Sequence, residues 1–430
     1  MNASPSHAAR LPGPRDFTWP LTVPGGEMAG AEVVRELPAQ VALPVWQALR
    51  SVLLWAAEPE ASRAGLFEEE AMRAWELELL EGTLENTLRD PLAVIVDELA
   101  TPGEASEPDL AWSCMCIANW CLDRRAVSTA LAFAEACALC WPEHARYAWF
   151  AGRLLRRHGR LKEAEQWMRR AVRLAASTGD FETQTLGMNS LGNILHEQGR
   201  YGDSRQTLQN ALRLARKFQL PQRQGEVLHD LLVSSHALGD LAQAEEYGRE
   251  ALDFYKDGHE RLPLLAHDVA WLWVSRGQHH RALTLLRELL PYVTDSRERL
   301  RVVASACQAA GACSENELFL SLWSQFQSLA ATRTSDEGLA SAFITVGYGA
   351  AYLSEREIAA TAIRSGLEIA KRRAEYDAVA RGESLLDQLA DRRRGDAIFD
   401  VLGTRPSPRR DPLTIAFVTS LRGSAQVVAA

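Results

Sequence analysis

Three segments of this chain align without gaps: HGRLKEAEQWMRRAVRLA (158–175), QGRYGDSRQTLQNALRLA (198–215) and LGDLAQAEEYGREALDFY (238–255). Their turn glycines, Gly159, Gly199 and Gly239, are 40 residues apart, and a fourth copy, RGQHHRALTLLRELL, places Gly277 another 38 residues on. Each glycine separates two stretches whose apolar residues recur at helical spacing. The repeat therefore predicts helix pairs, with the glycine at a turn that needs the left-handed backbone conformation.

Small or apolar residues lie five and twelve positions after each turn glycine: Ala164 and Ala171, Ser204 and Ala211, Ala244 and Ala251, Ala282 and Leu289. In the preceding helix the matching positions hold Ala151-Gly152, Leu191-Gly192, Leu231-Leu232 and Val269-Ala270. Because small side chains let two helix backbones approach closely, we expect the two helices of each unit to pack at these positions.

The stretch LGNILHEQGRYGDSRQTLQNAL (191–212) resembles the tetratricopeptide repeat (TPR). It carries Leu191-Gly192, the turn Gly199, Tyr201, Leu208 and Ala211, and it departs from the family pattern at Ser204, where alanine is preferred. The period of 40 exceeds the usual length of about 34 residues, so the resemblance is to the long-helix type found in many bacterial regulators and scaffolds. It implies an all-α fold, a right-handed α-solenoid of stacked antiparallel helix pairs.

The rest of the chain extends this array at both ends. Helical periodicity predicts further pairs over 109–122 with 125–139, 297–310 with 315–329, and 339–352 with 355–371, and a lone helix over 375–391 that covers the last pair. Amphipathic stretches over 44–56, 66–80 and 85–100 predict a helical N-terminal cap. The expected organisation is a poorly ordered segment 1–40, an acidic helical cap 41–100, a TPR-like array 109–372, a capping helix 373–394 and a flexible tail 395–430, with a short strand over Thr414–Thr419.

Charge and composition bear on the kinds of partner and the cellular location that we expect. The chain has 47 basic and 56 acidic residues, a net charge of −9, and residues 57–110 alone hold 15 acidic residues against three arginines. An acidic protein has no general attraction for phosphate backbones, so we expect no nucleic-acid partner. Apolar runs are too short for a membrane span, and Met1 to Phe17 lacks the apolar core of a secretory signal, so we expect no membrane partner and a cytoplasmic location.

Motifs for chemistry are absent from the sequence. There is no phosphate-binding loop ending in Gly-Lys-Ser or Gly-Lys-Thr, no His-Glu-x-x-His pair and no Gly-x-Ser-x-Gly elbow, so we expect neither an enzyme nor a cofactor. Cys137 and Cys140 have the spacing of half a zinc site, with Cys114, Cys116 and Cys121 one helix away. The favoured interpretation is reduced thiols that pack in the interior, so no metal is expected. The glutamates between Phe67 and Leu80 are read as a solvated helix face.

One stripe of the first helices is polar where packing residues are expected. Positions ten, six and three before each turn glycine are four and three residues apart and so share a helix face. They hold Trp149, Arg153 and Arg156 in the first unit, Asn189, Asn193 and His196 in the second, His229, Val233 and His236 in the third, and His267, Trp271 and Val274 in the fourth. The TPR resemblance implies that this stripe lines the concave surface, where Asn and basic residues hold peptide backbone or carboxylate.

These residues predict a peptide-binding groove. Asn offers both a donor and an acceptor, Arg binds carboxylate through two parallel bonds, and Trp supplies apolar area, so an acidic or C-terminal segment is the expected ligand. The histidines suggest pH-dependent binding. The expected function is a non-enzymatic scaffold or adaptor that binds a protein or peptide; the alternative is a sensor of a small molecule or signalling peptide that regulates an enzyme or transcription factor. A plain alternative for the stripe is that its polar residues simply face water.

Overall fold

The computed structural model describes residues 31–256, 258–331, 338–373, 375–390 and 411–428, and within these ranges the chain is all-helical, with no strands. Two compact units divide the chain, Met1–Arg223 and Gln224–Ala430. The boundary falls in the first turn of α11 (Pro221–Ala237).

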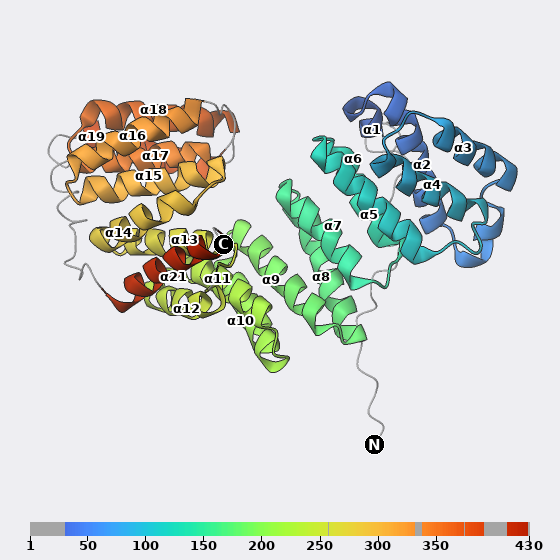
Figure 1. Ribbon diagram of the computed structural model, residues 1–430, viewed down its shortest axis with the longest axis horizontal. Helices are drawn as coiled ribbons and strands as arrows, with labels where there is room; N and C mark the ends of the chain where they lie inside the picture. Colours follow the sequence, from blue (N-terminus) through green and yellow to red (C-terminus); the bar gives the residue numbers. More distant parts are fainter. Residues whose placement is uncertain (1–30, 257, 332–337, 374, 391–410, 429–430) are drawn as a thin grey trace, which may run out of the picture. The chain divides into compact units, whose positions relative to one another are not determined.

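Unit 1 contains the cap helices and the first three repeat pairs (Figure 1). The cap consists of α1 (Ala31–Glu36), α2 (Ala39–Ala57), the 3₁₀ turn η2 (Glu60–Gly65), α3 (Glu69–Glu81) and α4 (Asn86–Ala100). The pairs are α5 (Glu107–Asp123) with α6 (Val127–Cys140), α7 (Ala145–Arg157) with α8 (Leu161–Thr178), and α9 (Phe181–Glu197) with α10 (Tyr201–Lys217).

Unit 2 continues the same architecture with α11 and α12 (Leu241–Phe254), α13 (Leu262–Ser275) and α14 (His279–Leu289), the 3₁₀ turn η3 (Leu290–Tyr292), α15 (Ser296–Ala312) and α16 (Asn316–Ala331), and α17 (Leu339–Tyr352) and α18 (Arg356–Arg373). Helix α19 (Tyr376–Ala390) packs on α18 and α17, and α21 (Pro412–Val428) packs on α14 and α13. Each unit is a stack of helix pairs, as the repeat predicts.

The turn inside each pair has one conformation throughout. The backbone φ is between 72° and 77° at Gly159, Gly199, Gly239 and Gly277, which confirms the left-handed turn expected from the sequence. The pairs with weaker sequence similarity keep this geometry without glycine, with φ of 61° at Arg125, 59° at Ser314 and 61° at Ser354. The repeat therefore extends beyond the four glycine-marked copies.

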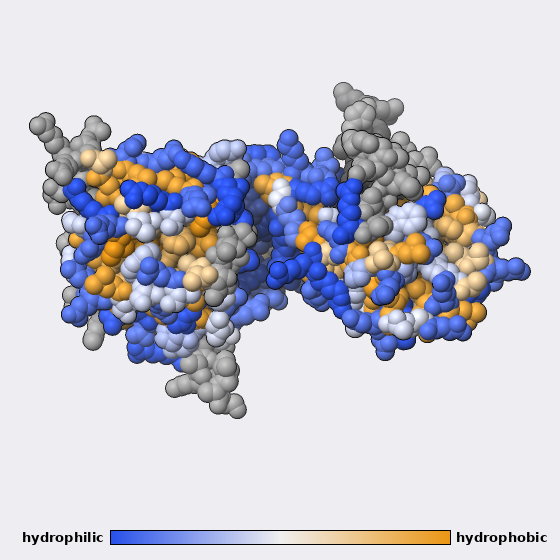
Figure 2. Space-filling model, turned by 90° about the horizontal axis from the view of Figure 1, so that it is seen from above, coloured by the Kyte–Doolittle hydropathy of each residue, from blue (hydrophilic) through white to orange (hydrophobic). Residues whose placement is uncertain are grey.

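The predicted close packing inside the pairs is also confirmed. The residues five and twelve positions after each turn glycine are buried, with Ala164, Ser204, Ala244 and Ala282 fully excluded from solvent. A β-carbon added at Gly192 would lie 2.6 Å from the side chain of Leu208, which shows how near α9 and α10 approach. Elsewhere apolar patches interrupt a hydrophilic surface (Figure 2).

The sequence expectations about both ends of the chain are wrong for the residues that the structure describes there. Residues 1–30 lie outside the described residues, but 31–40 are mostly helical rather than poorly ordered, because Val33 and Leu37 are buried. Glu36 accepts hydrogen bonds from the backbone N–H of Ser128 (2.9 Å) and Thr129 (2.8 Å) at the start of α6. Burial raises the pKa of Glu36, but these bonds outweigh it and hold the pKa below its usual value.

At the other end, residues 412–428 form a helix, so neither a flexible tail nor a strand over Thr414–Thr419 is correct there. Leu413, Phe417 and Leu421 recur every four residues and are buried, which favours a helix with one apolar face. Residues 395–410 of the expected tail lie outside the described part of the chain.

Candidate functional site

The polar stripe predicted from the sequence makes many of its contacts with the next repeat. In unit 1, Trp149 Nε1 donates to Ser190 Oγ (3.0 Å) and Arg156 Nε donates to Glu197 Oε1 (2.8 Å). Each of these partners is 41 residues further along the chain, on the first helix of the following pair. The stripe thus joins neighbouring repeats, a role that the sequence interpretation did not include.

The same pattern holds in unit 2. His236 Nε2 lies 2.8 Å from Ser275 Oγ, and His267 Nε2 lies 3.0 Å from Ser305 Oγ. Several stripe residues are more enclosed than a solvent-facing stripe would be, because Asn189, His229 and His267 are buried and Asn193, His196 and Val233 are half-buried.

In unit 1 the part of the stripe on α7 carries positively charged side chains. Two guanidinium groups lie near the ring of Trp149, with the Cζ of Arg153 at 5.1 Å and that of Arg146 at 5.3 Å from its centroid. Burial, together with the charges of Arg157 and Arg146, lowers the pKa of Arg153. Within the described residues no carboxylate forms an ion pair with Arg153, so α7 presents positive charge beside an aromatic ring.

Unit 2 contains a groove of about 580 Å³. Its walls come from α11, α13, α15 and α17, the first helices of four successive pairs, and from α19, which follows the last pair. The predicted residues His267 and Trp271 line it, as does Val233. Three arginines that the sequence interpretation did not select also line it: Arg297, Arg301 and Arg381.

The arginines differ in their surroundings. Arg381 Nη2 on α19 donates a hydrogen bond to Ser341 Oγ on α17 (2.9 Å). Arg297 and Arg301 have exposed side chains, and no carboxylate of the described residues pairs with either. Trp271 is 40% exposed. The groove therefore combines positive charge with an accessible aromatic surface.

Asp268 supplies a carboxylate at the same groove. His229 Nε2 lies 2.9 Å from its Oδ2, and His267 Nδ1 lies 3.4 Å from its Oδ1. Burial raises the pKa of Asp268, but the hydrogen bonds and charges of the two histidines outweigh this and hold the pKa well below its usual value. Because His267 also contacts Ser305, one polar network links α11, α13 and α15.

With this geometry established, comparison with protein families matches the tetratricopeptide repeat over residues 183–257. Residues 183–257 therefore contain tetratricopeptide repeats. TPR domains bind proteins and peptides, so a binding role is supported for this chain. No curated protein sequence matches the chain.

Solved structures share the TPR fold at low identity. RapI, in its apo form, is 11% identical with a TM-score of 0.51, over 62% of this chain and 99% of its own. Aspartyl phosphate phosphatase F from Bacillus subtilis is 12% identical with a TM-score of 0.50, over 82% and 96%. A signal-transduction ATPase with a TPR sensor, PH0952 from Pyrococcus horikoshii, is 13% identical with a TM-score of 0.50, over 74% and 55%. At these identities the likeness concerns the fold alone.

The five cysteines between positions 114 and 140 lie in the first TPR-like pair, α5 and α6. Cys114, Cys121, Cys137 and Cys140 are buried, and Cys116 is half-buried. Burial raises the pKa of Cys121 to about 12, and burial also raises the pKa of Cys137 well above its usual value. Such thiols are poor nucleophiles and poor ligands, and no group of three or more His, Cys, Asp or Glu suited to a metal ion occurs among the described residues.

The remaining features are the tryptophans of the repeats and the acidic helices of the cap. Trp167 and Trp273 are buried in the repeats, whereas Trp149 is half-buried and Trp271 is exposed. The acidic cap packs through α2 and α4 on α6 and α5. In the part of the chain that is described, no helix is both long and apolar enough to cross a bilayer.

Proposed function

We propose that the protein is a non-enzymatic cytoplasmic scaffold or adaptor of the long-period bacterial TPR type, and that it binds an acidic peptide segment in the unit 2 groove. The observation that carries this proposal is the pair Arg297 and Arg301. Both side chains line the groove, both are exposed, and neither is neutralised by a carboxylate of the described residues. Guanidinium groups in this setting bind carboxylates through paired hydrogen bonds.

The other groove residues suit the same ligand. Trp271 offers apolar area for a side chain of the peptide, and Arg381 adds a third positive group beside Ser341. The volume of about 580 Å³ lies within the range of roughly 300–1,000 Å³ that ligand pockets occupy, so the groove accommodates a short segment. The Asp268 carboxylate is held by His229 and His267, which limits its repulsion of an acidic ligand.

The direct test measures binding of a fluorescein-labelled acidic peptide with a free C-terminal carboxylate by fluorescence anisotropy. We expect Arg301→Ala to weaken binding by roughly 10- to 100-fold, the cost of a lost charged hydrogen bond. The matched control is Arg287→Ala, since Arg287 is also exposed but lies on α14 outside the groove. Equal affinities for the two variants would refute the assignment of the groove.

A second comparison locates the negative charge that is bound. If amidation of the C-terminus weakens binding to wild type but has no further effect on Arg301→Ala, Arg301 binds the terminal carboxylate. If amidation has no effect on either protein, the acidic side chains of the peptide are the recognised groups.

The alternative is a sensor that binds a small anion in this groove and regulates an enzyme or transcription factor. The groove volume and the three arginines favour a small anionic ligand as well, and PH0952 is described as having a TPR sensor. Thermal-shift screening of anionic metabolites against wild type and Arg301→Ala separates the two functions. Stabilisation of wild type alone by a metabolite, without binding of acidic peptides, would favour the sensor.

A further inference from the structure

The last described helix does not cap the end of the repeat stack. Helix α21 lies against α13 and α14, although about 120 residues separate it from them in the sequence (Figure 1). Among the described helices its main contacts are with these two, and α19 is not one of its principal neighbours. The surface of unit 2 that receives it, formed by Glu245, Trp273, Arg281 and Glu288, is called here the α21 dock.

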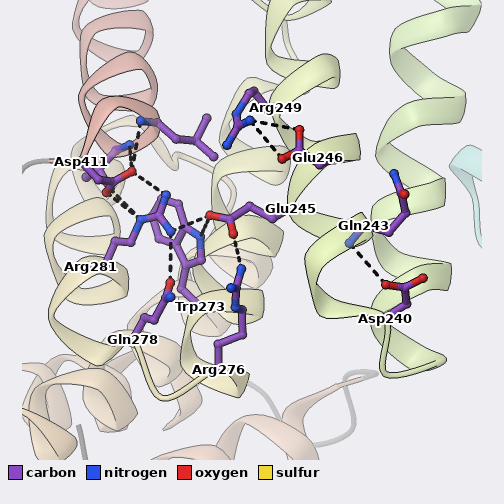
Figure 3. Close-up of polar contacts among 12 residues, drawn as sticks. Asp240, Gln243, Glu245, Glu246, Arg249, Trp273, Arg276, Gln278, Arg281 and Asp411 are labelled. Atoms are coloured by element: carbon purple, nitrogen blue, oxygen red, sulfur yellow. Dashed lines mark hydrogen bonds and ion pairs between the residues drawn. The ribbon is translucent and has the colours of Figure 1, made fainter. Parts of the chain in front are cut away.

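The dock binds α21 through one buried arginine. Arg281 Nε lies 2.6 Å from Asp411 Oδ2 and its Nη2 lies 2.5 Å from Asp411 Oδ1, a bidentate ion pair (Figure 3). Arg281 also pairs with Glu245 and lies 3.8 Å from the centroid of the Trp273 ring. Its side chain is only 9% exposed, so this ion pair is well shielded from water.

Asp411 has a second role as the N-terminal cap of α21. Its Oδ1 accepts hydrogen bonds from the backbone N–H of Leu413 (3.1 Å) and Thr414 (3.3 Å). The residue that pairs with Arg281 therefore also stabilises the start of the helix.

Apolar and polar contacts then continue along the helix. Leu413, Phe417 and Leu421 are buried. The Phe417 ring packs edge-on against the Trp273 ring, with 6.5 Å between the two ring centroids. Six residues before the end of α21, Arg422 Nη2 lies 2.7 Å from Glu288 Oε1. The dock therefore contacts three features of α21. These are the aspartate that caps its start, three apolar side chains four residues apart, and the arginine that follows them.

We propose that the dock also binds α21 of a second copy of this chain, so that two chains exchange their C-terminal helices. All of the recognised side chains lie within residues 411–422, and none of these contacts comes from another part of the chain than α21 and its first cap residue. A second copy is the occupant that carries the complementary charges at both ends, Asp411 for Arg281 and Arg422 for Glu288. Each copy has one dock and one helix, so a reciprocal exchange between two chains leaves no dock and no helix without a partner.

The test mixes two variants that each lack half of the contact. Arg281→Ala impairs the dock but keeps α21, and the Asp411→Ala, Phe417→Ala variant impairs α21 but keeps the dock. We expect each variant alone to be monomeric and the equimolar mixture to contain a 1:1 heterodimer, measured by light scattering and by capture through a tag on one partner. Circular dichroism checks that both variants fold. Glu288→Arg serves as a second dock variant if Arg281→Ala unfolds.

A labelled peptide spanning residues 411–428 gives an independent measurement. The peptide should bind the Asp411→Ala, Phe417→Ala variant. Its affinity should fall steeply when the Arg281→Ala substitution is introduced into that same variant. A mixture that stays monomeric at the highest concentration where both variants remain monodisperse would overturn the proposal, even if the peptide binds, because the dock would then accept a free helix but no second copy.

Discussion

Gly311 of α15 faces Gly349 of α17 so closely that a β-carbon added at Gly311 would lie 2.0 Å from the Gly349 carbonyl oxygen. The obstacle is backbone, which cannot rotate away as a side chain can. We expect Gly311→Ala to lower the free energy of unfolding of unit 2 by roughly 1–3 kcal/mol or more, through separation of the two helices. Urea unfolding followed by circular dichroism measures this change.

Gly423 provides the matched control, since it lies in α21 with no heavy atom within 4 Å of an added β-carbon. Gly423→Ala should be neutral or stabilise the helix by up to about 1 kcal/mol. Equal stability of Gly311→Ala and wild type would contradict the close approach of α15 and α17.

Glu135 of α6 titrates near neutral pH. Burial raises its pKa to about 7, although the charge of Arg160 and a hydrogen bond from Trp167 Nε1 (3.4 Å) oppose the shift. The folded protein therefore binds this proton more tightly than the unfolded chain, where the pKa is about 4.3. Its favourable contribution is complete below about pH 4.3 and is lost as the pH rises through about 7.

Glu135→Gln removes this ionisation and keeps an acceptor for Trp167. We expect the variant to be more stable than wild type at pH 8, by up to about 3 kcal/mol, and equally stable near pH 4.5. Thermal unfolding across this range is the measurement. A stability difference that is the same at both ends would show that the charge of Glu135 is not responsible.

Asp268 has the opposite pH dependence, because its folded-state pKa is held below the unfolded value near 3.9. Its contribution is present above that value and is lost as the pH falls through the lowered folded-state pKa. Asp268→Asn should cost about 1–3 kcal/mol at pH 7 through the lost charged hydrogen bonds to His229 and His267. The cost should shrink below pH 4 in urea-unfolding experiments, and a constant cost would contradict the assignment.

Arg153 is predicted to reduce the stability of unit 1. It is half-buried near Arg146 and Arg157, and no carboxylate of the described residues pairs with it. We expect Arg153→Met to raise the unfolding free energy by a few tenths to about 1 kcal/mol at low salt, with a smaller gain at high salt where like charges are screened. Arg156→Met should be less favourable, because it removes the ion pair with Glu197.

The sequence was a good guide to the fold wherever the turn glycine is present. Gly159, Gly199, Gly239 and Gly277 mark the turns because the left-handed conformation favours glycine there. At Ser314 and Ser354 the same conformation is held by the packing of the helices, so the sequence pattern weakens although the geometry persists. Helix α21 was missed because its apolar residues are supported by a dock that is distant in the sequence.

The candidate site was predicted only in part. His267 and Trp271 follow from the four strong repeats, but Arg301 lies 13 residues before the turn residue Ser314, outside the positions that the repeat pattern selected. Arg381 comes from α19, a helix outside the repeat pairs. Periodicity places residues on a helix face but does not show which helices converge on one groove.

Two tryptophans of α13 separate the two proposed sites. Trp271 lines the groove, whereas Trp273, two residues later, lies under Arg281 in the α21 dock. A displacement of α13 therefore moves a residue of each site. Binding at the two sites is then coupled, and the coupling free energy acts equally in both directions. If seating α21 changes the affinity of the groove by some factor, an occupied groove changes the equilibrium for seating α21 by that same factor.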